Sequence, residues 1–204
     1  MTRYYSEIVA KQGLDLSMKM MIERVPMQAQ VLDVGCASGY LAAPLREGRS
    51  CPVVDGIEID PQDAAIARTR CRMVLEGSAS DPRTYAALPD RYDAVLFGDV
   101  LEHLPQPEEA QVAVRAVLAP NARIISSIPN VAHHSIRWEL LCGRFNYSDL
   151  GNHSGDGANW VSARRALTTE LWDGESDGCS SFPSFVSQTL LEARDFFDST
   201  ERSA

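Results

Sequence analysis

The sequence contains no long hydrophobic run, since none of its apolar stretches approaches the roughly 20 residues that a helix needs to cross a bilayer. Its first ten residues, MTRYYSEIVA, also lack the apolar core of a signal peptide. We therefore expect a cytoplasmic protein that is not inserted into a membrane.

Positive charge is scarce. The chain has 19 Lys and Arg residues against 28 Asp and Glu residues, which gives a formal net charge of −9 at pH 7. The basic residues form no stripe that could reverse this charge locally. Because such a protein repels a phosphate backbone, we expect no nucleic-acid partner.

Cysteine is present, but not in a pattern that indicates pairing. The chain has five cysteines, an odd number, and no C-x-x-C pair that would indicate a zinc or redox site. We expect free thiols. The cysteines are Cys36, Cys51, Cys71, Cys142 and Cys179.

The chain does have an alternation of apolar strands and helices. At 204 residues, with 45% hydrophobic residues, it is long enough to bury one full core. Strand and helix alternate four times after a helical stretch over residues 1–25, which is typical of βαβ units. We predict a single α/β domain with a mainly parallel central sheet and helices on both faces. The predicted strands are AQVLDVG, CPVVDGIEID, RMVLEG, YDAVLFGDV and ARIISSIPN.

Proline and capping residues set the expected helix ends. In YLAAPLRE, Pro44 requires a late beginning or a kink. Asp60 is the predicted N-cap of the next helix, with Pro61 at its first position. PEEAQVAVRAVLA predicts a further helix, which Pro120 and Asn121 end.

The composition changes near residue 150. Between residues 151 and 184 the only aliphatic residues are Val161, Leu167 and Leu171. FVSQTLLEARDFF then regains a helical apolar pattern. We therefore predict a domain over residues 1–150 and a loop-rich tail over residues 151–204 with one terminal helix.

The stretch VLDVGCASG leads from a buried strand into a loop of small residues. In a parallel sheet, ligands bind beyond the carboxyl ends of the strands. Gly35 and Gly39 allow a ligand to approach the backbone, and the next helix N-terminus favours a negative group. Asp33 favours a positive one. The amino-acid end of S-adenosylmethionine carries both charges.

Glu58 is a second acid at a strand end, 25 residues after Asp33. A carboxylate at this place can accept hydrogen bonds from both hydroxyls of a ribose. The alternative is a solvated charge at the end of a strand. The acid and glycine loop of the first strand favours the ribose interpretation.

Three segments, VLDVGCASGYLA, VDGIEIDP and YDAVLFGDVLEHL, resemble in order and spacing the motifs of class I S-adenosylmethionine-dependent methyltransferases. The likeness covers residues 25–150 and implies a Rossmann-like fold. Nicotinamide-binding Rossmann proteins have the loop G-x-G-x-x-G, whereas this chain has G-x-x-x-G after an acid, which favours methyl transfer. The resemblance implies these cofactor-binding residues: Asp33, Gly35, Cys36, Ala37, Gly39, Glu58, Ile59, Ser78 and Asp99.

The chain departs from the family pattern at two cofactor positions. Ala37 stands where the family commonly has its middle glycine. In EGSASD, Ser78 stands where many relatives have an acid that binds the adenine amino group. Either Asp81 replaces that acid, or stacking and backbone contacts hold the base.

Histidines are the candidate catalytic residues. If the acceptor is a hydroxyl, a base must take its proton, and histidine has a suitable pKa. His103 follows the fourth strand, whereas His133 and His134 follow the fifth, so all three are predicted at one pocket rim. Taken singly, each has the alternative of a surface or helix-capping role.

An acid and histidine cluster also resembles that of metal-assisted O-methyltransferases, which include ubiquinone-pathway enzymes and small-RNA 2′-hydroxyl methyltransferases. Its candidate metal ligands are Asp99, Glu102 and His103 with His133 or His134. A divalent ion could lower the pKa of the acceptor hydroxyl. The alternative, which we favour, is that no metal is bound and that Glu102 and His103 brace the following helix.

The segment HHSIRWELLCGRFNYSDLG resembles one in small bacterial methyltransferases of sugar and surface-polysaccharide gene clusters. Trp138, Phe145 and Tyr147 form either an acceptor wall or a cover for the sheet edge. The His-x-Arg-Phe-Phe element that usually follows is absent from NHSGDGANWVSARR. We therefore expect the C-terminal hairpin strands to be missing or altered.

The function that the resemblance implies is methyl transfer from S-adenosylmethionine to an oxygen, in preference to a nitrogen, of a small molecule such as a sugar or glycan precursor. A homodimer is compatible with it. Two alternatives remain open: a non-catalytic cofactor-binding or interaction protein with a degraded C-terminus, and an NAD-dependent oxidoreductase.

Overall fold

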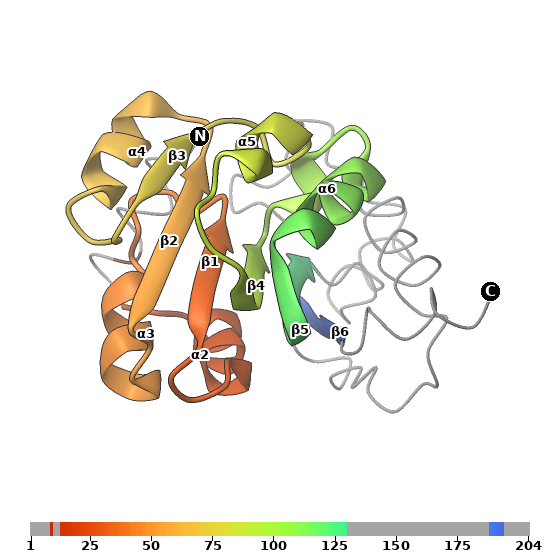
Figure 1. Ribbon diagram of the computed structural model, residues 1–204. Coiled ribbons are helices and arrows are strands. Elements are labelled where there is room, and N and C mark those ends of the chain that lie inside the picture. Colours follow the sequence, from red (N-terminus) through yellow and green to blue (C-terminus); the bar gives the residue numbers. More distant parts are fainter. Residues whose placement is uncertain (1–8, 10–12, 130–187, 194–204) are drawn as a thin grey trace, which may run out of the picture.

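A computed structural model describes residues 9, 13–129 and 188–193 of the chain (Figure 1). Within these residues the elements form a central sheet with helices on both faces. None of the helices found there is long and apolar enough to cross a membrane.

The sheet has six strands in the order β3-β2-β1-β4-β5-β6. β1 lies in the middle and pairs in parallel with β2 and β4, and these pair in parallel with β3 and β5. The five predicted strands are therefore confirmed. The strands are β1 (Gln30–Val34), β2 (Val53–Glu58), β3 (Val74–Glu76), β4 (Tyr92–Gly98), β5 (Leu118–Pro129) and β6 (Gln188–Ala193).

Two hydrophobic clusters cover the two faces of the sheet. Successive residues of β1 and β4 point to opposite faces, so that Val31 lies in one cluster and Leu32 in the other. α2, α3 and α4 bury residues in the first cluster, whereas α5 and α6 bury residues in the second. The helices are α2 (Leu16–Arg24), α3 (Ala42–Arg49), α4 (Pro61–Ala67), α5 (Pro82–Ala86) and α6 (Pro107–Val114).

Local sequence accounts for two helix starts. α3 begins late, with Pro44 in its first turn, where a missing N–H removes no helical hydrogen bond. α4 begins at Pro61, and the Asp60 side chain accepts hydrogen bonds from the backbone N–H groups of Gln62 and Asp63. Both helix starts agree with the predictions made from the sequence.

The predicted terminal helix over FVSQTLLEARDFF is wrong where the structure describes it, because residues 188–193 form β6. β6 runs antiparallel to β5 and pairs Pro129 with Gln188 through to Ile124 with Ala193. Pairing along a neighbouring strand is a tertiary contact that overrides a local helical pattern. The side of β5 away from β4 is therefore paired by a strand.

The boundary between α6 and β5 also differs from the prediction. α6 ends at Val114, a 3-10 turn, η2 (Arg115–Val117), follows, and β5 begins at Leu118. Leu118 pairs with Tyr92, and the register then shifts before Ala94 pairs with Arg123. Pro120 and Asn121 therefore lie within β5 at this bulge, whereas the sequence predicted them between the helix and the strand.

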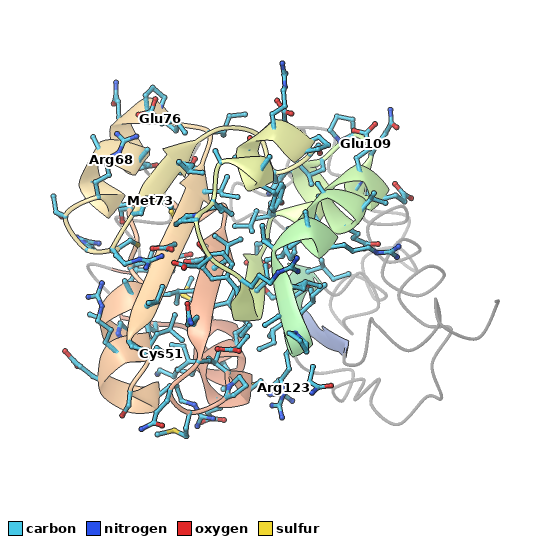
Figure 2. The ribbon with its side chains drawn as sticks, in the orientation of Figure 1. Cys51, Arg68, Met73, Glu76, Glu109 and Arg123 are labelled. Carbon is cyan, nitrogen blue, oxygen red and sulfur yellow. The ribbon has the colours of Figure 1, made fainter. Side chains whose placement is uncertain are left out.

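An ionic cluster around the buried Asp55 carboxylate connects β2 to β4. The fully buried Asp55 carboxylate accepts from Arg72, with Nε to Oδ1 at 3.0 Å and Nη2 to Oδ2 at 2.5 Å, and from the Tyr92 hydroxyl at 2.7 Å. Arg72 also pairs with Asp90 at 2.5 Å. By contrast, Arg68 and Glu76 form an exposed pair at 2.6 Å on the α4 side (Figure 2).

Candidate functional site

The candidate site lies at the carboxyl ends of three neighbouring strands, β2, β1 and β4. The predicted residues at these strand ends are Asp33, Gly35, Glu58 and Asp99. We call these four residues the strand-end site. β1 is the point from which the chain order runs outward in both directions, so its carboxyl end is where ligands of open parallel sheets bind.

The loop after β1 needs glycine at two places. Gly35 has φ +72°, and a Cβ there would collide with the side chain of Val100, which follows β4. Gly39 has φ +71°, and a Cβ there would lie 3.2 Å from the Cα of Ala67 and 3.1 Å from the Sγ of Cys71. These glycines therefore let the loop pack against two neighbouring segments.

Hydrogen bonds fix the shape of this loop. The N–H groups of Gly35 and Cys36 donate to the Ile57 carbonyl at 2.8 and 3.1 Å. Arg70 donates to both the carbonyl and the hydroxyl of Ser38 at 3.2 Å. The loop is therefore held from β2 and from the segment after α4.

The Cys36 side chain faces the protein interior. Its Sγ lies 2.5 Å from where a Cβ on Gly56 would be, which explains the glycine in β2. A hydrogen bond with Cys71, together with burial, raises the pKa of the Cys36 thiol. Cys36, Cys51 and Cys71 are free thiols, as predicted, and the other two cysteines lie outside the described residues.

Asp33 is a buried carboxyl group, 4% exposed. Burial, and then the nearby charge of Glu58, raises the pKa of Asp33 from its ordinary 3.8 to about 7. Among the described residues, no hydrogen bond or ion pair reaches the Asp33 carboxylate. A positive group beside it would satisfy this charge.

Glu58 connects two loops. Its Oε2 accepts from the N–H of Ala37 at 2.8 Å, and its Oε1 accepts from the N–H of Asp60 at 2.8 Å. Ala37 takes φ +45°, so this alanine adopts the left-handed region that a glycine would adopt more easily. Each Glu58 oxygen retains acceptor capacity beyond the one bond it makes.

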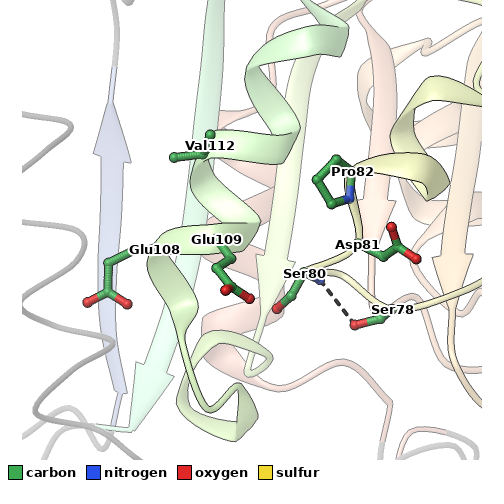
Figure 3. Close-up of a pocket in the computed structure, with 7 residues that line it drawn as sticks. All are labelled: Ser78, Ser80, Asp81, Pro82, Glu108, Glu109 and Val112. Carbon is green, nitrogen blue, oxygen red and sulfur yellow. Dashed lines mark hydrogen bonds between the residues drawn. The ribbon is translucent and has the colours of Figure 1, made fainter.

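A cavity of about 720 Å³ lies between the segment after β3 and the first turns of α6 (Figure 3). Two hydrogen bonds hold the segment after β3. The Tyr85 hydroxyl donates to the Ala79 carbonyl at 2.8 Å, and the Ser80 N–H donates to the Ser78 hydroxyl at 3.2 Å. The lining residues are Ser78, Ser80, Asp81, Pro82, Glu108, Glu109 and Val112.

The two residues considered for adenine both line this cavity, but they differ in their partners. Asp81 is the N-cap of α5 and forms an ion pair with Arg83 at 2.8 Å. The Ser78 hydroxyl accepts a hydrogen bond from the N–H of Ser80. Ile59, directly after β2, leaves 70% of its surface exposed.

Asp99 is the first residue after β4, and its φ of +52° is in the left-handed region. Its N–H donates to the carbonyl of Ser127 at 3.1 Å and to the Ser127 hydroxyl at 3.2 Å. The same hydroxyl donates to Oδ1 of Asp99 at 3.0 Å.

Of the three candidate catalytic histidines, only His103 lies within the described residues. His103 ends a 3-10 turn, η1 (Leu101–His103), and is exposed, whereas Glu102 beside it is buried. His133 and His134 lie outside the described residues, as do Trp138, Phe145 and Tyr147. In the described ranges, no three His, Cys, Asp or Glu residues are grouped so that they could hold a metal ion.

Several residues that shape the site were not singled out from the sequence. Arg70 and Val100 contact the loop after β1 from the segments that follow α4 and β4, and Ser127 contacts Asp99 from the neighbouring strand β5. One observation could have pointed to Ser127: it stands near the end of the fifth predicted strand, the next neighbour of the fourth. Its partner could not be named without the pairing of Gly98 with Ser127.

Comparison with known proteins agrees with this geometry. A family model described as a methyltransferase domain matches residues 2–196. A ubiquinone biosynthesis O-methyltransferase from Alkalilimnicola ehrlichii is 28% identical over 152 residues, which cover 72% of this chain and 60% of that protein. One from Cereibacter sphaeroides is 30% identical over 127 residues, which cover 61% of this chain and 49% of that protein.

Among solved structures, a methyltransferase from Thermotoga maritima, described as a possible histamine N-methyltransferase, superposes with a TM-score of 0.58 at 16% identity and covers 95% of each chain. This likeness is one of fold. The chain spans between about half and three fifths of the length of the two curated relatives above. It belongs to the family of class I S-adenosylmethionine-dependent methyltransferase domains.

Proposed function

We propose that the strand-end site binds S-adenosylmethionine and that the chain transfers a methyl group to an oxygen atom of a small molecule. The observation that carries this proposal is the Asp33 carboxylate, which is buried and lacks a donor among the described residues. An ammonium group is the ligand chemistry that best satisfies such a site, because it supplies the missing charge and donates hydrogen bonds.

The neighbouring residues suit the rest of the ligand. Glu58 retains lone pairs on both oxygens, enough to accept from two ribose hydroxyls. Ile59 offers an exposed apolar side chain against which an adenine ring can stack. Ser78, one of the residues that line the cavity between β3 and α6, is in our proposal the residue beside the base.

When bound, S-adenosylmethionine supplies a methyl group on a positively charged sulfur. The protein must hold methyl donor and acceptor in line, and such positioning is worth on the order of 7 kcal/mol. We assign the role of base to His103, which is exposed and lies four residues after Asp99 in the chain, and to His133 and His134. No metal ligand set is required in this proposal, and the rate should be unchanged by a chelator.

The choice of an oxygen in a small molecule rests on two observations. The two curated relatives above are O-methyltransferases by name. The net charge of −9 disfavours a polyanionic acceptor such as nucleic acid. The likeness of residues 133–151 to enzymes of sugar gene clusters supports a sugar or glycan precursor as the first acceptor to test.

Calorimetry with S-adenosylhomocysteine and with NAD tests the cofactor assignment. We expect the first ligand to bind and NAD not to bind. The Asp33→Asn variant, which keeps the size of the side chain, should lose most of the binding, and Asp90→Asn is the matched control because Asp90 lies in the ionic cluster of Asp55. NAD binding with no S-adenosylhomocysteine binding would replace the proposed function with that of an oxidoreductase.

The acceptor is tested with labelled S-adenosylmethionine and three acceptor classes: sugars, phenols and amines. Transfer to a sugar or phenol hydroxyl supports the proposal, and transfer to the amine alone contradicts it. Cofactor binding without transfer to any acceptor in a lysate supports a non-catalytic protein instead.

A further inference from the structure

The Ser127 side chain forms two hydrogen bonds with Asp99 that are separate from the backbone pairing of β4 with β5. The Ser127 hydroxyl accepts from the Asp99 N–H at 3.2 Å and donates to the Asp99 carboxylate at 3.0 Å. Ser127 is 1% exposed, so water has little access to compete for either hydrogen bond. A hydrogen bond to a charged group in such a place contributes more than an exposed one.

The backbone of Asp99 needs such a contact. A left-handed φ is unfavourable for an L residue, although aspartate tolerates it better than most residues. The bond from the Asp99 N–H to the Ser127 carbonyl, at 3.1 Å, holds this turn, and the hydroxyl contacts fix the side chain as well. Asp99 is therefore restrained at both its backbone and its carboxylate.

The position that Ser127 restrains lies within the strand-end site. β4 pairs with β1 on one side and with β5 on the other, so Asp99 stands between the glycine loop and Ser127. Val100, the next residue, fills the space that a Cβ on Gly35 would need. A change in the Asp99 turn is therefore expected to reach the cofactor loop directly.

We propose that Ser127 is a positioning residue that holds the Asp99 carboxylate in the strand-end site, so that cofactor affinity depends on the Ser127 hydroxyl through Asp99. This inference rests on the proposed function, since it assumes that the strand-end site takes S-adenosylmethionine. Asp99 adds a carboxylate to those of Asp33 and Glu58. Three acids at one edge suit a ligand that carries an ammonium and a sulfonium group.

The chain offers a matched control in the adjacent residue. Ser126 is also fully buried in β5, and its hydroxyl has no hydrogen-bond partner among the described residues. Because successive residues of a strand point to opposite faces, its side chain lies on the other face of the sheet from that of Ser127. Ser126→Ala removes the same atom as Ser127→Ala without touching Asp99.

The experiment is a double-mutant cycle in the affinity for S-adenosylhomocysteine, measured by calorimetry on the full chain. Its variants are Ser127→Ala, Ser126→Ala, Asp99→Gly and the double variant of Asp99 and Ser127. Glycine is chosen at 99 because it accepts the left-handed backbone without strain. Unfolding midpoints are measured in parallel, because a structural role alone would lower stability without making affinity depend on the Asp99 side chain.

We expect Ser127→Ala to weaken binding about tenfold, as loss of a hydrogen bond to a charged group predicts, and Ser126→Ala to change it less than about twofold. In the Asp99→Gly background, Ser127→Ala should weaken binding by less than about twofold. An undiminished effect in that background, or equal effects of the two serine variants, overturns the inference.

Two further outcomes are distinguishable. If the wild-type protein does not bind the ligand at all, the proposed function fails and the inference fails with it. If the wild type binds and Ser127→Ala binds equally well, only the inference fails. Should Ser127→Ala not fold, Ser127→Cys replaces it in the cycle, since the thiol fills the same place but is a weak hydrogen-bond donor.

Discussion

Asp33 occupies an environment that disfavours its own charge. In the folded protein, burial and Glu58 raise the pKa of this carboxyl to about 7, against 3.8 in its ordinary state. Between these two values the native state binds a proton that the unfolded state lacks. The stabilisation that the protonated Asp33 carboxyl contributes is therefore complete below about pH 4 and is lost as the pH rises through about 7.

Replacing this residue should stabilise the protein without its ligand. We predict that Asp33→Asn raises the free energy of unfolding at pH 8 by up to about 4 kcal/mol, because the amide carries no charge to bury. The gain should disappear near pH 4, where the wild-type carboxyl is itself neutral. Urea unfolding at both pH values measures it, and an equal effect at pH 4 and pH 8 would contradict the assignment of the pKa.

At the scale of elements, the loop between β1 and α3 depends on its fit against α4. We predict that Gly39→Ala destabilises the protein by about 1 to 3 kcal/mol and weakens ligand binding, because the added methyl meets Ala67 and Cys71 at a positive φ. Gly48→Ala is the control. Gly48 lies in α3 with nothing within 4 Å of an added Cβ, so this variant should be neutral or slightly stabilising.

The connection of β2 to β4 rests on a buried charge. We predict that Arg72→Ala lowers the free energy of unfolding by about 3 to 5 kcal/mol, since it leaves the Asp55 carboxylate buried with the Tyr92 hydroxyl as its one remaining partner among the described residues. Arg68→Ala breaks the exposed pair with Glu76 and should cost less than about 1 kcal/mol. Similar losses in the two variants, measured by urea unfolding, would show that the Asp55 cluster is not the source of the difference.

Features that depend on neighbouring residues in the chain were predictable from the sequence, whereas features that depend on residues far away in the chain were not. The apolar runs of β1 and β4, the cap at Asp60 and the acids at strand ends depend on nearby residues alone. β6 is a strand because β5 offers it hydrogen-bond partners, a contact some 60 residues away along the chain. Ser127 belongs with β6 in this respect, because only the register between β4 and β5 brings it to Asp99.

At the scale of the whole molecule, the sheet order explains why the candidate residues meet. β1 lies between β2 and β4, so the carboxyl ends of three parallel strands bring Asp33, Glu58 and Asp99 to one edge. Helices on both faces bury the strands and leave that edge for the ligand. The fold thus brings three acids to the edge at which open parallel sheets bind their ligands.

The measurement that tests the central claim most directly is the affinity for S-adenosylhomocysteine from pH 6 to pH 8, in wild type and in Asp33→Asn. If Asp33 binds the ammonium group, the wild type must lose a proton from this carboxyl on binding. With a pKa of about 7, its affinity should rise about tenfold between pH 6 and pH 8, with about a fivefold rise between pH 6 and pH 7. The variant should bind weakly with no such rise. Wild-type affinity that is independent of pH, or a variant that binds as tightly as wild type, would contradict the account.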